Sequence, residues 1–85
     1  MIINIGAEFG TYLESNDIAN ELIAILNKIP EDEFILDFKE VIFVNMNFAQ
    51  AYYAGKADSS KKISEINLSD NIRVTMGAAD EAVNP

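Results

Sequence analysis

The sequence contains no cysteine and no histidine. Their absence excludes disulfide bonds, thiol nucleophiles, imidazole acid–base catalysis and the usual zinc sites. The acids, hydroxyls and lysines that remain can catalyse reactions, but no two of them are arranged in a recognisable catalytic pattern. We therefore predict that the protein is not an enzyme and that it holds no metal and no cofactor.

Long apolar segments are also absent, because nowhere do about 18 apolar residues follow one another, as a membrane-spanning helix requires. The first ten residues, MIINIGAEFG, lack the basic region and the apolar run of a secretory signal. We expect a protein that is neither exported nor inserted in a membrane, with a cytoplasmic location.

Basic residues are scarce, since 14 acids stand against 6 bases and give a net charge of -8. Affinity for nucleic acid comes mainly from Lys and Arg that displace counterions from phosphates, so direct nucleic-acid binding is disfavoured. The charge is compatible with solubility alone. It is also compatible with an acidic face that binds a basic protein, including as a mimic of nucleic acid.

The 85 residues, of which 49% are hydrophobic, suffice for one small domain over residues 1–85 with a packed core. Their apolar patterns predict strands and helices that alternate. The expected elements are a strand at 2–5, a helix at 15–29, a strand at 34–38, a helix at 45–55, a strand at 63–68 and a helix from 70 onward. This βαβαβα order predicts an α/β fold with a mainly parallel sheet of three to four strands and helices packed over its faces. We expect the tail, residues 80–85, to fray.

Helix boundaries are marked by capping residues. Thr11 and Glu14 have the spacing of a capping box, with Ser15 as a competing N-cap of the first helix, and Ser69 is a suitable N-cap of the last. Gly55 is expected to end the middle helix.

The nearly uninterrupted apolar run at 34–38 is typical of a strand covered on both faces by helices. In the strand at 63–68, Ile66 and Leu68 alternate toward one side, and Ile63 breaks this alternation. The middle helix is expected to turn a stripe of four residues toward the core: Phe48, Ala49, Tyr52 and Tyr53.

Polar residues follow the central strand and open the middle helix. Asp37 lies near the carboxyl end of that strand, where ligand sites of such sheets are found, although its carboxylate can simply accept N–H groups of the following turn. Asn45, Met46 and Asn47 form the junction with the helix, and Gln50 should face outward one turn later. The four glycines fit neither spacing of a phosphate-binding loop. We interpret these five residues as a candidate partner-binding surface.

The segment FILDFKEVIFVNMNFAQAYYAG resembles the core of STAS domains, the fold of sulphate transporters and anti-sigma-factor antagonists. In that fold a hydrophobic strand ending in Leu-Asp leads to Val-x-Phe-Ile-Asp-Ser-Ser-Gly and a helix. More narrowly, EFGTYLESNDIANEL, LDFKEVIFVNMNFA and EINLSDNIRV are similar to three segments of a small STAS-like family of unknown function. Together these segments cover most of the chain.

The resemblance aligns Leu36 and Asp37 with the end of the family's central strand, and Met46 with its phosphorylated serine. Because Met46 has no hydroxyl group, the phosphorylation that switches such proteins between partners cannot occur at this position. The resemblance thus implies a non-catalytic protein-binding or regulatory module. Its implied partners are kinase-like ATPases, anti-sigma factors or other signalling or defence proteins.

Two functions from other classes remain open. One is an acidic inhibitor of viral or mobile-element origin that blocks a basic groove on a host protein. The other is a small-molecule or nucleotide sensor at the carboxyl ends of the strands. The exposed edges of a three-stranded sheet also leave room for a homodimer.

Overall fold

The structure, a computed structural model, describes residues 1–85 and contains five strands and four helices. In chain order these are β1 (Ile2–Asn4), α1 (Ile5–Phe9), β2 (Tyr12–Leu13), α2 (Asn16–Lys28), β3 (Glu33–Asp37), β4 (Phe43–Val44), α3 (Met46–Asp58), β5 (Lys62–Ile66) and α4 (Asp70–Val83). The strands form a three-stranded sheet, in the order β1-β3-β5, and a two-stranded sheet, β2-β4, and all pairs are parallel. The prediction of a small α/β domain with parallel strands is confirmed.

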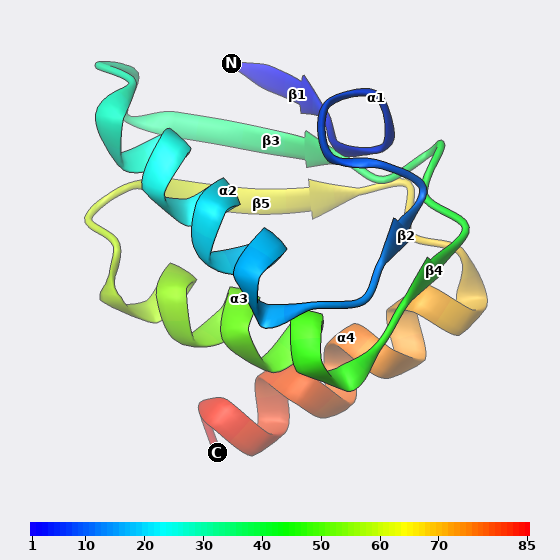
Figure 1. Ribbon diagram of the computed structural model, residues 1–85. Helices are drawn as coiled ribbons and strands as arrows, with labels where there is room; N and C mark the ends of the chain where they lie inside the picture. The colour runs from blue at the N-terminus through cyan, green and yellow to red at the C-terminus, as the bar shows by residue number, and fades with distance from the viewer.

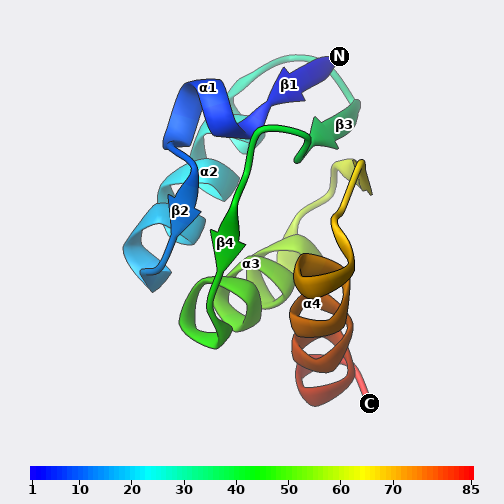
Figure 2. The same ribbon diagram turned by 90° about the vertical axis from the view of Figure 1, so that its right-hand side faces the viewer.

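The three-stranded sheet is covered on one face only. Figures 1 and 2 show α2, α3 and α4 on the same side of the sheet, with no helix over the opposite face. The prediction of helices on both faces is therefore wrong. In β3, Phe34 and Leu36 are buried against the helices, whereas Ile35 points the other way and is only partly buried. Its shielding comes from the neighbouring strands, where it pairs with Ile2 and Ser64.

The chain leaves this sheet after Asp37 and forms β4, which pairs with β2 and not with β3. In Figure 1 the β2-β4 pair runs from the carboxyl ends of the large sheet down to the starts of α2 and α3. Three elements were not predicted from the sequence: α1, β2 and β4. They span five, two and two residues, which is too short for a helical or alternating apolar pattern to repeat.

Each long helix begins at a polar side chain that caps its free backbone N–H groups. Ser15, and not Thr11, caps α2, because its Oγ accepts the N–H of Ile18 at 3.2 Å. Ser69 caps α4 through the N–H of Ile72 at 3.4 Å. The helix α2 ends as expected before Pro30, since a residue that precedes proline is pushed out of the helical region.

Two helices extend further than expected. The helix α3 continues through Gly55 to Asp58, so the prediction that Gly55 ends it is wrong. Gly55 instead permits close packing of α2 on α3, because a Cβ atom there would lie 2.8 Å from Cγ1 of Ile23. The helix α4 runs to Val83, well into the segment 80–85 that we expected to fray.

One core cluster of 19 buried residues fills the space between the sheet and the helices. It includes the whole predicted stripe of α3: Phe48, Ala49, Tyr52 and Tyr53. In β5 the two isoleucines point to opposite faces, because Ile63 is buried at 6% exposure whereas Ile66 is 39% exposed on the open face.

Candidate functional site

Of the predicted junction residues, Asn45 has a structural role. It is the N-cap of α3, where its Oδ1 accepts the N–H of Phe48 at 3.0 Å. Its Nδ2 donates to the carbonyl of Glu14 at 2.7 Å and thereby ties the start of α3 to the segment before α2. With both ends of the amide engaged inside the chain, Asn45 positions this region and offers little to a partner.

Met46, Asn47 and Gln50 lie on the first turns of α3 and are exposed to solvent. Met46 and Gln50 are four residues apart and therefore share one side of the helix. The expectation that Met46 lies at the surface is confirmed by its 39% exposure. Their role in binding a partner stays a prediction.

Asp37 lies apart from these residues, because β4 separates the carboxyl end of β3 from the start of α3 (Figure 1). Its Oδ1 accepts the side-chain amide of Asn67 at 3.0 Å and the backbone N–H of Lys39 at 2.9 Å. The bond from Asn67, followed by that from Lys39, holds the pKa of Asp37 below its usual value. Asn67 can approach because it adopts the left-handed conformation, with φ 59°, that asparagine tolerates. This geometry matches the structural reading of Asp37.

The carboxyl ends of β1 and β3 are closed by contacts within the chain. The side chain of Asn4 donates to Glu40 and accepts the N–H of Ala7. Gly6 packs against the same turn so closely that a Cβ atom there would lie 2.6 Å from the Cβ of Glu40. Neither of the two surface pockets in the structure is lined by Asp37.

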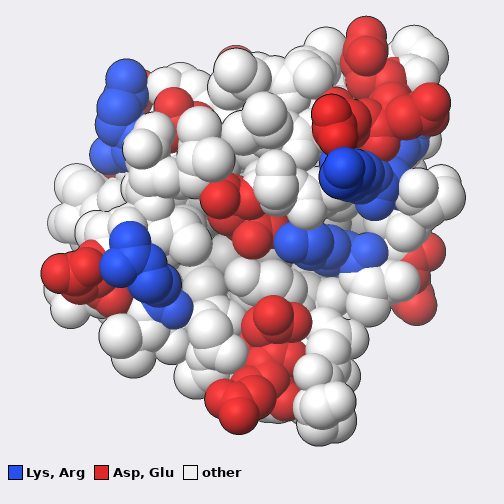
Figure 3. All heavy atoms as spheres, turned by 180° about the vertical axis from the view of Figure 1, so that it is seen from behind, with Lys and Arg blue, Asp and Glu red and all other residues white.

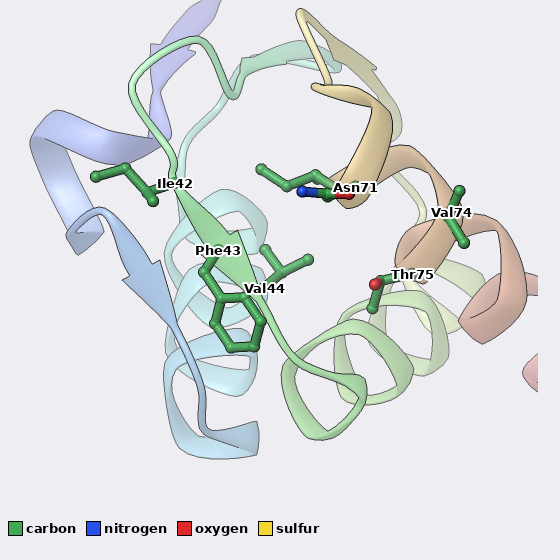
Figure 4. Close-up of a pocket in the computed structure, with 7 residues that line it drawn as sticks. Ile42, Phe43, Val44, Asn71, Val74 and Thr75 are labelled. Carbon is green, nitrogen blue, oxygen red and sulfur yellow. The ribbon is translucent and has the colours of Figure 1, made fainter.

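A cleft of about 360 Å³ lies instead between β4 and α4. Its seven lining residues are Ile42, Phe43, Val44, Asn71, Ile72, Val74 and Thr75. In Figure 4, Val44 points from β4 toward α4, Phe43 lies in front of the strand, and Asn71 and Thr75 face the strand from the helix. The side chains of Asn71 and Thr75 make no hydrogen bond within the chain, so they are free to bond to a bound molecule.

Apolar side chains gather around this cleft although they are exposed. Nine large hydrophobic residues are exposed in the whole chain, and five of them lie on β2, on β4 and the residue before it, on α4 and on the first turn of α3: Tyr12, Ile42, Phe43, Met46 and Val74. Tyr12 and Phe43 are directly opposite each other in the β2-β4 pair. We call these five residues the β4–α4 patch. Clustered exposed apolar side chains of this kind mark interaction sites more often than scattered ones do.

Sequence reasoning missed the cleft because it depends on α4 packing beside β4. One signal was present in the sequence. Val74 is apolar but lies outside the buried stripe that Ile72, Met76 and Ala79 form on α4, and it is 73% exposed. A large apolar residue on the polar side of an amphipathic helix is the feature that points to this surface.

A polar cluster between α3 and β5 was also not predicted. The hydroxyl of Tyr52 donates to Oε2 of Glu65 at 2.5 Å, and Nζ of Lys56 contacts the same oxygen at 2.7 Å. Burial, followed by the charge of Glu65, raises the pKa of Tyr52, so the phenol stays neutral. The cluster fixes α3 against the edge strand β5. Lys56 is only partly exposed because of this contact.

Charges on the side of the molecule opposite to the view of Figure 1 are mixed. Figure 3 shows Asp and Glu in separate groups there, several of them beside Lys or Arg, and no continuous acidic surface. The chain contains three ion pairs: Lys56–Glu65, Lys62–Glu33 and Arg73–Asp70. The surface charge expected of an acidic inhibitor is thus interrupted on this side.

The open face of the three-stranded sheet carries the exposed Ile2 and Ile66 and the partly buried Ile35. Three strands about 4.8 Å apart, with about 3.3 Å per residue, give a face of roughly 250 Å². Stable interfaces bury about 800 Å² per partner. This face alone is therefore too small to be the main binding surface.

Searches for other kinds of site and for related proteins gave no positive result. No cluster of three or more Asp or Glu residues is placed to hold a metal ion, and none of the helices combines the length and apolarity needed to cross a bilayer.

No family model matches the chain, and neither a curated protein nor a solved structure matches it. The resemblance to STAS-like proteins thus stays a prediction.

Proposed function

We propose that the protein is a non-catalytic protein-binding module that binds a partner protein through the β4–α4 patch. The observation that carries this proposal is the gathering of the exposed Ile42, Phe43 and Val74 around a cleft open to solvent. Tyr12 continues the apolar surface on β2, opposite Phe43. An aromatic side chain at the centre of such a surface supplies large contact area at low entropic cost.

The cleft supplies polar groups as well as apolar area. Asn71 and Thr75 lie on the α4 side, where they can bond to the backbone of a segment seated against Phe43. Such unpaired polar groups beside an apolar anchor fix the orientation of a bound chain.

This surface includes the position that resembles the phosphorylated serine of STAS domains, Met46. The proposal therefore describes binding that phosphorylation at this position does not control. Regulation, where it exists, depends on partner concentration or on another site.

The proposal is tested with substitutions that put a charge into the patch and leave the fold intact. Val74→Asp and Met46→Asp suit this purpose, because Val74 is 73% exposed and Met46 lies in the first helical turn, where the helix dipole stabilises an acid. Phe43→Ala removes the central aromatic ring. A fully desolvated aromatic anchor is worth about 2 kcal/mol, so Phe43→Ala should weaken binding roughly 30-fold.

The assay captures partners of the tagged protein from its source cells and then measures the affinity of each purified partner for every variant. Asn20→Asp on the exposed side of α2 adds the same charge as Val74→Asp and serves as the matched control. We expect the three patch variants to lose binding and the control to keep it. A partner that binds all four variants equally, or turnover of a substrate by the purified protein, would contradict the proposal.

A further inference from the structure

A second groove, of about 320 Å³, lies between the edge strand β1 and α2 and is separate from the β4–α4 patch. Its apolar lining comes from β1, from α1, from α2 and from the C-cap of α2: Ile2, Ile3, Phe9, Leu22, Ile25, Leu26 and Ile29. It runs along β1 from α1 at one end to the carboxyl end of α2 at the other (Figure 1). The volume falls within the range of about 300–1,000 Å³ that is typical of binding pockets.

The strand that borders this groove has unpaired backbone groups. In a parallel pair, alternate residues direct both N–H and C=O to the same neighbour. The carbonyl of Met1 accepts the N–H of Ile35 at 2.8 Å, so Met1 is bonded to β3, and by alternation Ile3 is as well. The N–H and C=O groups of Ile2, between them, therefore point to the open edge. Figure 1 shows no element beyond β1 on this side. The strand can therefore accept one more strand.

The rim of the groove is acidic. Glu8 of α1 and Glu21 of α2 are the two charged residues among its lining, and both are exposed. Neither forms an ion pair within the chain. Two free carboxylates beside an apolar floor, in a protein with a net charge of -8, favour a basic ligand.

From these three features we infer that the β1–α2 groove binds an extended basic segment of a partner protein, which adds a strand to β1. Its alternate apolar side chains enter the groove over Ile3 and Leu22, and its Lys or Arg side chains pair with Glu8 and Glu21. Strand addition of this kind takes affinity from backbone hydrogen bonds and specificity from the pockets between strand and helix.

A second copy of the chain fits the groove less well. The same acidic rim and the same net charge of -8 repel an identical molecule. Complementary charge on the ligand is thus the feature that selects the occupant.

The probe is a labelled seven-residue peptide, Lys-Thr-Val-Thr-Val-Thr-Lys, which as a strand places both valines and both lysines on one side. We expect it to shift the backbone amide signals of Ile2, Asn4 and Ile25 in NMR spectra, and to bind more weakly as salt is raised. The same peptide with Glu in place of Lys should bind at least about tenfold more weakly, because attraction is replaced by repulsion.

Two variants test the two halves of the inference. Ile2→Pro removes the N–H that faces the open edge and leaves the bonds of Met1 and Ile3 to β3 in place, so it should weaken peptide binding about fivefold. Glu21→Lys should weaken it about tenfold, whereas Glu81→Lys, with the same charge change on exposed α4, should leave it nearly unchanged.

Thermal unfolding of each variant confirms that the fold is retained before binding is compared. Signal shifts confined to other surfaces, or equal affinity of Glu21→Lys and Glu81→Lys for the peptide, would overturn the inference. So would a dimer of the unaltered protein in sedimentation that Ile2→Pro abolishes, since a second copy would then occupy the groove.

Discussion

Two glycines in helices offer a quantitative test of how closely α2 and α3 pack. Both Gly55 in α3 and Gly77 in α4 have ordinary negative φ values, so alanine suits the backbone at either position. Alanine is favoured over glycine in a helix interior by about 1 kcal/mol. At Gly77 an added Cβ atom meets nothing within 4 Å, so Gly77→Ala should raise the free energy of unfolding by about 0.5–1 kcal/mol.

Gly55→Ala should have the opposite effect. The added Cβ atom would lie 2.8 Å from Cγ1 of Ile23 and 3.3 Å from both its Cβ and its Cγ2. Rotation of the Ile23 side chain does not move its Cβ, so the two helices must separate. Overpacking of this kind costs about 1–3 kcal/mol, which exceeds the helical gain, and the net change should be a loss of about 1 kcal/mol.

The assay is urea unfolding monitored by circular dichroism, with thermal unfolding as a second measure. For a domain of this size 1 kcal/mol corresponds to about 4–8 °C in Tm, so the two variants should shift Tm in opposite directions. The cost should shrink when the closest obstacle is removed. In an Ile23→Ala background, itself less stable by about 2–5 kcal/mol, the 2.8 Å contact with Cγ1 is absent and only the 3.3 Å contact with Cβ remains, so Gly55→Ala should destabilise the protein much less than it does beside Ile23. Equal stabilisation by Gly55→Ala and Gly77→Ala in the otherwise unaltered protein would refute close packing at this contact.

Three further predictions concern polar groups. Asn45→Ala should lower the free energy of unfolding, measured by urea unfolding, by about 1–2 kcal/mol, because it removes the α3 cap and the bond to the segment before α2. An unchanged free energy of unfolding would contradict the capping geometry. Tyr52→Phe should lower the free energy of unfolding by about 1–2 kcal/mol at neutral pH, because the bond to Glu65 is lost. Since the folded-state pKa of Tyr52 is raised, the stability of the unaltered protein should fall as pH rises above 10. If the Phe variant loses stability over the same alkaline pH range, Tyr52 is not the cause of that loss. In an NMR titration the carboxyl group of Asp37 should show a pKa below the usual value of 3.8. Its contribution to stability is therefore present above pH 3.8 and is lost as pH falls through the lowered pKa. Asn67→Ala should raise the pKa of Asp37 toward the usual value, because the bond that lowers it most is removed.

The sequence was sufficient where a pattern repeats over several turns. The spacing of apolar residues accounts for the buried stripes of α3 and α4 and for a central strand at Phe34 and Leu36. The capping residue accounts for the start of α2. Helices of this length carry enough apolar positions to define a buried side without reference to the rest of the molecule.

The predictions failed where the outcome depends on a contact between distant segments. Gly55 has the sequence appearance of a helix end, and only its distance to Ile23 shows that it is a packing position. Ile35 completes an apolar run that suggests burial on both faces, although strands beside it, and no helix, shield it. The same dependence explains why the cleft at Phe43 was missed, since α4 must first be placed next to β4.

The candidate site was predicted in part. Met46 and its neighbours do lie at the surface, but Asn45 is engaged as a cap and Asp37 lies at the other end of β4. We had predicted no separate strand between the central strand and the helix. A strand of two residues that pairs elsewhere was enough to separate them.

The parallel pairing of every strand has a consequence for how the chain reaches this structure. Ile2 meets Ile35, Tyr12 meets Phe43 and Glu33 meets Lys62, so no ladder joins segments that are neighbours in sequence. No hairpin is available to nucleate a sheet, and each pairing requires closure of a long loop before it is stabilised. A growing polypeptide therefore gains its first lasting β-structure only when β3 has emerged from the ribosome, and folding speed should respond most strongly to changes in that strand.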